Sequence, residues 1–232
     1  REAIFEIHLK PIQLGEDIDI KVLAGRTPGF SGADIANICN EAALIAAREQ
    51  SDAVDMQHFY RATDRVIAGL EKKSKIITPE EKKIIAYHEA GHATASWYLP
   101  HADSLMKVSI IPRGRSLGAA WYLPEERQIY TKSQMLDRMV MALAGRAAEE
   151  LVFGEISSGA LDDLEKTTKQ AYTMVAYYGL DKELGPISYY DSSGQSEQSL
   201  YRPYSEETAH LIDKEVRQLV ESAYQQALDL LE

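Results

Sequence analysis

Five consecutive residues of the sequence, His88-Glu89-Ala90-Gly91-His92, match the pattern H-E-x-x-H. The surrounding pattern predicts a helix, so the two histidines lie one turn apart on the same face and can reach one metal ion. Zinc accepts histidine nitrogen at about 2.0–2.1 Å. Glu89 follows the first histidine and can take a proton from a metal-activated water molecule. The motif predicts a zinc-dependent peptidase site, with His88 and His92 as ligands and Glu89 as general base.

A catalytic zinc site needs a third protein ligand and keeps a fourth position open. The position six residues after His92 holds Tyr98, which excludes the metzincin arrangement of three histidines. The remaining candidates are two pairs of acidic residues on later helices, Glu149 with Glu150 and Asp162 with Asp163. Glu149 could instead orient a ligand histidine from behind, and either aspartate could instead stabilise a helix N-terminus. Spacing alone does not choose among them.

Two other classes of protein could carry the same motif. A regulatory fragment with an inactive site would have lost the catalytic residue, whereas Glu89 is present. A purely structural zinc site usually has four ligands, often cysteines, and the chain has a single cysteine, Cys39. We interpret Cys39 as a small buried apolar residue, because Ile35, Ile38 and Ala42 share its helical face.

Composition narrows the class of protein further. The chain has 232 residues, of which 45% are hydrophobic and 26% charged, as in an ordinary globular protein. Its formal net charge of -11 argues against a nucleic-acid partner. The sequence contains no signal-peptide pattern and no apolar run of the roughly 18–20 residues that a membrane span needs. Because it opens at Arg1 in a charged amphipathic stretch, we interpret it as a soluble fragment of a longer protein.

The elements that must position the motif are mainly helical. A helical module, with one helix capped by Ser31 and another starting near Asp55, precedes a charged linker at residues 71–83. The motif helix starts at Pro79 and ends near Leu99, before Pro100. Three later helices are predicted at Ser133–Phe153, Leu161–Tyr178 and Ser205–Leu231, with glycine caps at Gly154 and Gly179. Two short strands are predicted at 108–111 and 119–123, and a polar surface loop at 191–199.

The order of several motifs resembles the FtsH family of ATP-dependent, membrane-anchored zinc metalloproteases over essentially the whole chain. The residues that carry the resemblance fall in six segments: Thr27–Asp34, Asn40–Leu44, Tyr87–Ala93, Ile110–Gly114, Ala144–Glu150, and Ser158–Ala160 with Asp163. The resemblance implies a mainly α fold with a small β element. Residues 1–70 would be the helical lid of an AAA+ ATPase, 71–83 a linker, and 84–232 a mostly helical zinc metallopeptidase domain.

The resemblance also implies roles for particular residues. In this family the third zinc ligand is an aspartate in a Gly-Ala-x-x-Asp segment, which corresponds here to Asp163, while Asp162 falls on a variable position. Gly32 and Ala33 fall where AAA+ lids contact the adenine side of the nucleotide, although helix capping alone would also explain them. The sequence contains no G-x-x-x-x-G-K-[ST] motif. ATP and Mg²⁺ would therefore act only in the full-length protein.

Partners and location follow from the same resemblance. We expect one Zn²⁺ per chain, polypeptide substrates that are unfolded or membrane proteins, and a homohexamer. Contact with a membrane would run only through a segment preceding Arg1, with this part on the cytoplasmic or equivalent side. An extended substrate could pair with the strand at 119–123 through backbone hydrogen bonds, or that strand could simply belong to the core.

Overall fold

The computed structural model describes residues 1–71, 77–113, 117–123, 127–190 and 204–232. The chain divides into two compact units, one formed by residues 1–77 and 109–127 and the other by residues 78–108 and 128–232. The domain limits expected from the sequence, 1–70, 71–83 and 84–232, stay a prediction. The loop expected at 191–199 lies outside the described residues.

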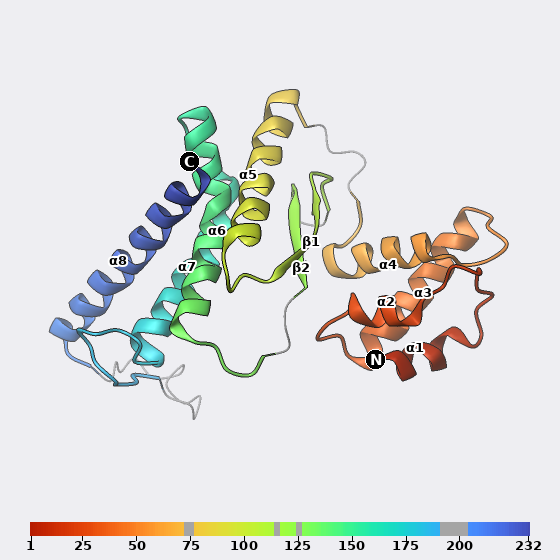
Figure 1. Cartoon of the computed structure of the whole chain (residues 1–232), viewed down its shortest axis with the longest axis horizontal. Coiled ribbons are helices and arrows are strands. Elements are labelled where there is room, and N and C mark those ends of the chain that lie inside the picture. Colours follow the sequence, from red (N-terminus) through yellow and green to blue (C-terminus); the bar gives the residue numbers. More distant parts are fainter. Residues whose placement is uncertain (72–76, 114–116, 124–126, 191–203) are drawn as a thin grey trace. The chain divides into compact units, whose positions relative to one another are not determined.

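The described helices of the first unit, labelled in Figure 1, are α1 Glu2–Leu9, α2 Ile20–Gly25, α3 Gly32–Arg48 and α4 Met56–Ala68. Their apolar faces meet in one core, in which Phe5, Ile35 and Phe59 are fully buried. Ser31 caps α3 with a reciprocal hydrogen bond to Asp34, as its spacing predicts. The same arrangement at Asp55, with His58 as the partner, starts α4.

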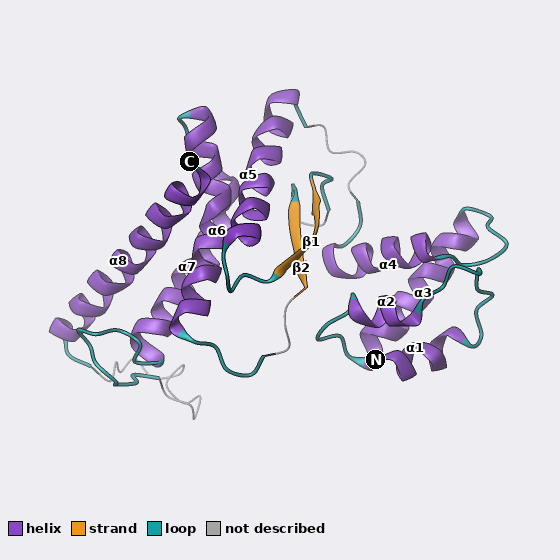
Figure 2. Cartoon of the chain, in the orientation of Figure 1, coloured by secondary structure: helices purple, strands orange, loops and turns teal. Residues whose placement is uncertain are grey.

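The second unit contains the motif helix and three partner helices, drawn in purple in Figure 2: α5 Pro79–Tyr98, α6 Lys132–Phe153, α7 Leu161–Tyr172 and α8 Glu206–Leu231. A 3₁₀ turn, Ser158–Ala160, leads into α7, and a π-helical turn, Thr173–Tyr177, follows it. Met139 and Leu143 of α6 are buried in the same core as Met174 and Val175 of the π turn. Helix α6 therefore packs against α5, α7 and α8, and its buried face can line a site formed between these helices.

Most helix ends lie within two residues of the positions predicted from the sequence. Helix α5 starts at Pro79 after a capping box between Thr78 and Glu81. Gly154 ends α6 in the left-handed conformation with a φ of 67°. The expected helix at Leu161–Tyr178 changes character after Tyr172, because the Tyr178 amide donates to the Thr173 carbonyl, five residues earlier.

The small β element is a two-stranded sheet of β1 Ser104–Ser109 and β2 Ala119–Leu123. The second strand has the predicted bounds, and its central Trp121 is buried. The first strand was predicted at 108–111, and these bounds were wrong: the strand runs from Ser104 to Ser109, so only its last two residues match the prediction. The Ile111 amide donates to the Ser109 hydroxyl two residues before it, a local bond that competes with strand pairing.

The described helices also bear on membrane insertion. None of those in the described ranges combines the length and the apolar character needed to cross a bilayer.

Candidate metal centre

Helix α5 presents the two motif histidines to one point. His88 and His92 are both buried, and their Nε2 atoms lie 3.1 Å apart. The rings meet edge to face, with centroids 4.7 Å apart. The four-residue spacing brings the two rings together as predicted. Glu89, between them in sequence, is also buried.

Helix α7 brings Asp163 to the same point. One carboxylate oxygen, Oδ2, lies 3.3 Å from Nε2 of His88 and 3.5 Å from Nε2 of His92. The neighbouring Asp162 is largely exposed and forms an ion pair with Lys166. Consecutive helical residues point about 100° apart, which explains why only one of the two aspartates faces the histidines.

Helix α6 holds both rings from behind. His88 Nδ1 lies 2.7 Å from Oε1 of the buried Glu149, and His92 Nδ1 lies 2.8 Å from the Met141 carbonyl oxygen. The other oxygen of Glu149 accepts the Ser157 amide at 2.7 Å. A carbonyl or carboxylate oxygen only accepts, so each Nδ1 carries a hydrogen, and Nε2 is the atom through which a neutral ring can bind a metal ion.

These charges shift the protonation of the group when no ion lies between them. Burial alone would lower the pKa of His88, but the Asp163 and Glu149 carboxylates outweigh it and raise this pKa above its ordinary value. Burial alone would raise the pKa of Asp163, but hydrogen bonds from His88 and His92 hold it well below its usual range. The cluster therefore favours a positive charge at its centre.

The donor set fits a zinc ion. His88, His92 and Asp163 each offer one ligand atom, and these atoms lie within 4.8 Å of one another. Tetrahedral zinc with bonds of about 2.0–2.1 Å separates its ligand atoms by roughly 3.3 Å. The three separations observed here, 3.1, 3.3 and 3.5 Å, bracket that value. Two imidazoles with one carboxylate is also a ligand set used by catalytic zinc.

The remaining candidates from the sequence have other contacts. The Glu150 carboxylate accepts a hydrogen bond from the Tyr224 hydroxyl on α8. Gly32 and Ala33 lie in the exposed first turn of α3, whose cap is made by Ser31 and Asp34, and their contact with a nucleotide stays a prediction. Gly91 provides space, as its mid-helix cost predicts, because a Cβ there would lie 2.3 Å from the Ala144 carbonyl oxygen.

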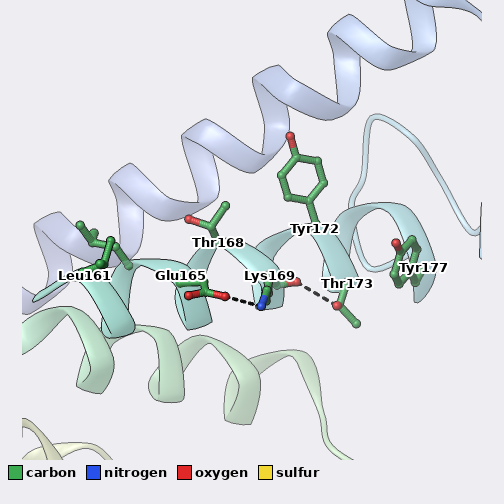
Figure 3. Close-up of a pocket in the computed structure, with 8 residues that line it drawn as sticks. Leu161, Glu165, Thr168, Lys169, Tyr172, Thr173 and Tyr177 are labelled. Carbon is green, nitrogen blue, oxygen red and sulfur yellow. Dashed lines mark hydrogen bonds and ion pairs between the residues drawn. The ribbon is translucent and has the colours of Figure 1, made fainter. Parts of the chain in front are cut away.

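A separate hollow lies along α7, with a volume of about 780 Å³. Figure 3 shows side chains of α7 and the π turn around it, including Leu161, Tyr172 and Tyr177, with an ion pair between Glu165 and Lys169. None of the three convergent ligands lines it.

Comparison with known proteins assigns the sequence that builds this site to a family. The profile of peptidase family M41 matches residues 75–232, and the profile of an AAA+ lid domain matches residues 17–60. The chain belongs to peptidase family M41. The M41 match covers the motif helix and all three helices that surround it.

Relatives of this M41 chain agree with the resemblance. It is 58% identical over 231 residues to a protein of Parabacteroides distasonis named ATP-dependent zinc metalloprotease FtsH. A protein of the same name from Rhodothermus marinus is 56% identical over 234 residues. The mouse mitochondrial inner membrane m-AAA protease component AFG3L2 is 54% identical over 235 residues. Each match covers 100% of this chain and 34%, 34% and 29% of the respective relative.

The chain therefore spans about a third of the length of the curated relatives it matches. The expected family, fold class and hydrolase class are confirmed: the family and its relatives support a zinc metalloprotease, with an AAA+ lid and a mainly helical peptidase region.

Two features of this M41 site were missed in the sequence. The Met141 contribution is a backbone carbonyl, which no side-chain pattern can reveal. Gly145 lies in the middle of α6, and a Cβ there would come within 2.6 Å of Nε2 in both His88 and His92. A glycine inside a long predicted helix was the available signal, since it is costly unless space is needed.

Proposed function

We propose that this chain is the peptidase-bearing part of an ATP-dependent zinc metalloendopeptidase, with His88, His92 and Asp163 as zinc ligands and Glu89 as general base. The observation that carries the proposal is the convergence of three ligand atoms at 3.1–3.5 Å. Among the described residues this group has three protein ligands, as a catalytic site does, whereas closed structural sites have four.

Zinc, when bound, supplies a Lewis acid that lowers the pKa of a water molecule and polarises the scissile carbonyl. Glu89 accepts a proton from the attacking water molecule while the water oxygen adds to the carbonyl carbon of the substrate. When the carbon–nitrogen bond breaks, Glu89 delivers that proton to the leaving amine. The protons balance, and no covalent bond between substrate and protein is required.

The surrounding residues keep this geometry fixed. Glu149 and the Met141 carbonyl accept the Nδ1 hydrogens and so set both ring orientations and tautomers. Glu149 is itself held by the Ser157 amide, directly before the turn that leads to Asp163. Burial of both histidines and Glu89 limits access of bulk water, which strengthens the electrostatic interactions within the site.

For the whole protein we propose the wider role that the relatives' names support. ATP and Mg²⁺ would be used by an AAA+ ATPase domain whose lid is the helical module, with Gly32 and Ala33 on the adenine side. Polypeptides, unfolded or membrane-derived, would be the substrates of a homohexamer, and nucleic acid would have no part. Membrane attachment would come from a segment outside this chain, with the peptidase on the cytoplasmic or equivalent side.

The direct test loads the purified chain with zinc and follows cleavage of casein and of a short fluorogenic peptide. We expect about one zinc per chain, and cleavage that stops on chelation with 1,10-phenanthroline and returns when zinc is restored. Zinc binding by the folded chain without cleavage of either substrate would favour a structural or regulatory site instead. Cleavage of the peptide but not casein would locate the missing step in substrate delivery.

A further inference from the structure

We infer that Gly145 is a positioning residue for the metal, because its missing side chain is what allows the two histidine ligands to converge. The inference rests on the proposed function, in which His88 and His92 bind zinc. It concerns a residue of α6 that offers the ion no ligand atom of its own.

The space at Gly145 is occupied by the ligand rings themselves. A Cβ at this position would lie 2.6 Å from Nε2 of His88, 2.6 Å from Nε2 of His92 and 2.7 Å from Cε1 of His88. Ordinary van der Waals contact for a Cβ begins near 3.4 Å. The shortfall, 3.4 Å against 2.6 Å, is about 0.8 Å. A methyl group on residue 145 would thus meet the two atoms that must hold the ion.

Moving the two rings away from such a methyl group would cost free energy. Their far sides are bonded to α6, His88 to Glu149 and His92 to the Met141 carbonyl. Met141, Gly145 and Glu149 are spaced by four residues and so share one face of the helix. Moving the rings by about 0.8 Å would break these bonds or shift the Nε2 atoms, and metal ligation tolerates errors of only about 0.2 Å.

The second close glycine of the unit shows what a packing role looks like instead. A Cβ at Gly91 would meet the Ala144 carbonyl oxygen at 2.3 Å and the Ala148 Cβ at 2.7 Å. Those neighbours belong to the framework of α6, so Gly91 sets how closely the two helices approach. At Gly145 the three nearest atoms all belong to the imidazoles, which separates a metal-positioning role from helix packing.

The test compares Gly145→Ala with the parent chain and with Gly25→Ala. Gly25 also lies in a helix, but a Cβ there has nothing within 4 Å, so it controls for the change from glycine to alanine. Zinc affinity is measured by competition with a chelating dye, and folding by circular dichroism in chelator. We expect Gly145→Ala to fold and to lose at least tenfold in zinc affinity, the scale of effects on residues that orient ligands. A loss below tenfold in the folded variant would overturn the inference.

If Gly145→Ala does not fold, a second comparison decides. Replacing both histidines by alanine removes the atoms that a Cβ at residue 145 would meet, so adding Gly145→Ala to His88→Ala/His92→Ala should leave the melting temperature unchanged or raise it, since alanine favours a helix interior over glycine. A further drop would mean that Gly145 serves the helix framework, against the inference. Zinc bound at parental affinity by His88→Ala/His92→Ala would contradict the proposed function itself, which separates the two failures.

Discussion

At the scale of single residues, neighbouring side chains in one turn of α5 have different proposed roles: His88 and His92 as metal ligands and Glu89 as general base. His88 and His92 converge on one point through Nε2, while Glu89 lies between them in sequence and is buried beside them. Asp163 completes the convergent group from another helix, and its neighbour Asp162 is turned to solvent. The roles therefore depend on side-chain direction more than on residue type.

Glu89→Gln tests this separation. The amide keeps the size of the side chain but cannot accept the proton of water, so peptide hydrolysis should fall by roughly 10²–10⁴-fold. Zinc content, measured by inductively coupled plasma mass spectrometry, should match that of the parent. A variant that folds normally but loses its zinc would show that Glu89 holds the metal and that its assignment as base is wrong.

Acid should release the metal through His88. Its raised pKa means that protons compete with zinc for Nε2 as the pH falls toward and below this pKa, above the ordinary value of 6.5. Zinc affinity, measured in a series of buffers with a chelating dye, should therefore weaken already above pH 6.5. An affinity that stays flat down to pH 6 would contradict protonation at the ligand atom.

In chelator, the opposite charges of His88 and Asp163 should stabilise the fold in a way that depends on pH. A raised His88 pKa contributes stability below 6.5 that is lost as pH rises through the folded value, and a lowered Asp163 pKa contributes stability above 3.8 that is lost toward acid. The stability difference between the parent and Asp163→Asn, measured by urea unfolding, should be greatest between pH 3.8 and 6.5. A difference that grows above pH 7 would mean that the ion pair is not formed.

At the scale of elements, the contact between α5 and α6 determines whether a site can form. Gly91 lets the two helices approach so closely that a Cβ there would lie 2.3 Å from the Ala144 carbonyl oxygen and 2.7 Å from the Ala148 Cβ. From that close position α6 can reach the rings with the Met141 carbonyl and Glu149. Helix α7 then needs to supply one carboxylate.

Gly91→Ala should therefore destabilise the second unit. Overpacking typically costs about 1–3 kcal/mol, offset in part by the roughly 1 kcal/mol that alanine adds to a helix. We expect a lower melting temperature both in zinc and in chelator, measured by circular dichroism with Gly25→Ala as the control. A melting temperature unchanged or raised in chelator would show that the helices can separate without loss.

The helices were predictable because local signals mark them. Capping boxes at Ser31, Thr78 and Thr131 and the glycine at Gly154 specify ends within a few residues. Strand β1 ends at Ser109, two residues before the predicted end, because the hydrogen bond from the Ile111 amide to the Ser109 hydroxyl competes with strand pairing. The alternation of apolar and polar residues in the sequence does not reveal that bond.

That His88 and His92 meet at one point was predictable from a spacing of four within one helix. That Asp163 joins them was not, since it lies on a separate helix and only the family resemblance selected it. On α6, the sequence offered Glu149 as a residue that could orient a histidine, and it contacts His88. The Met141 carbonyl was missed because a backbone group leaves no motif, and Gly145 was missed although a glycine inside a long predicted helix is a signal.

At the scale of the whole molecule, the two units have separate apolar cores. Every buried member of the first core lies between residues 5 and 62, and every member of the second lies between residues 95 and 227. The proposed ligands belong to the second unit alone. Zinc should therefore support one unit directly and leave the other with its own core.

Cys39 offers a reporter for the first unit. Burial in that core raises the pKa of its thiol to about 11, so few thiolates exist at pH 8. Ellman's reagent should not react with the native chain, in zinc or in chelator, and should find the single thiol in urea. Rapid labelling caused by chelation alone would show that the first unit opens when zinc is lost.

The central claim is that zinc is held by His88, His92 and Asp163, and zinc content after dialysis against a weak chelator tests it most directly. The parent should keep about one zinc per chain, and Asp163→Asn should lose most of it, because an amide is a much poorer ligand than a carboxylate. Asp162→Asn, the matched control on the adjacent exposed residue, should keep its zinc, and Glu149→Gln should fall between the two. Retention of zinc by Asp163→Asn together with its loss from Glu149→Gln would contradict the account and move the third ligand to α6.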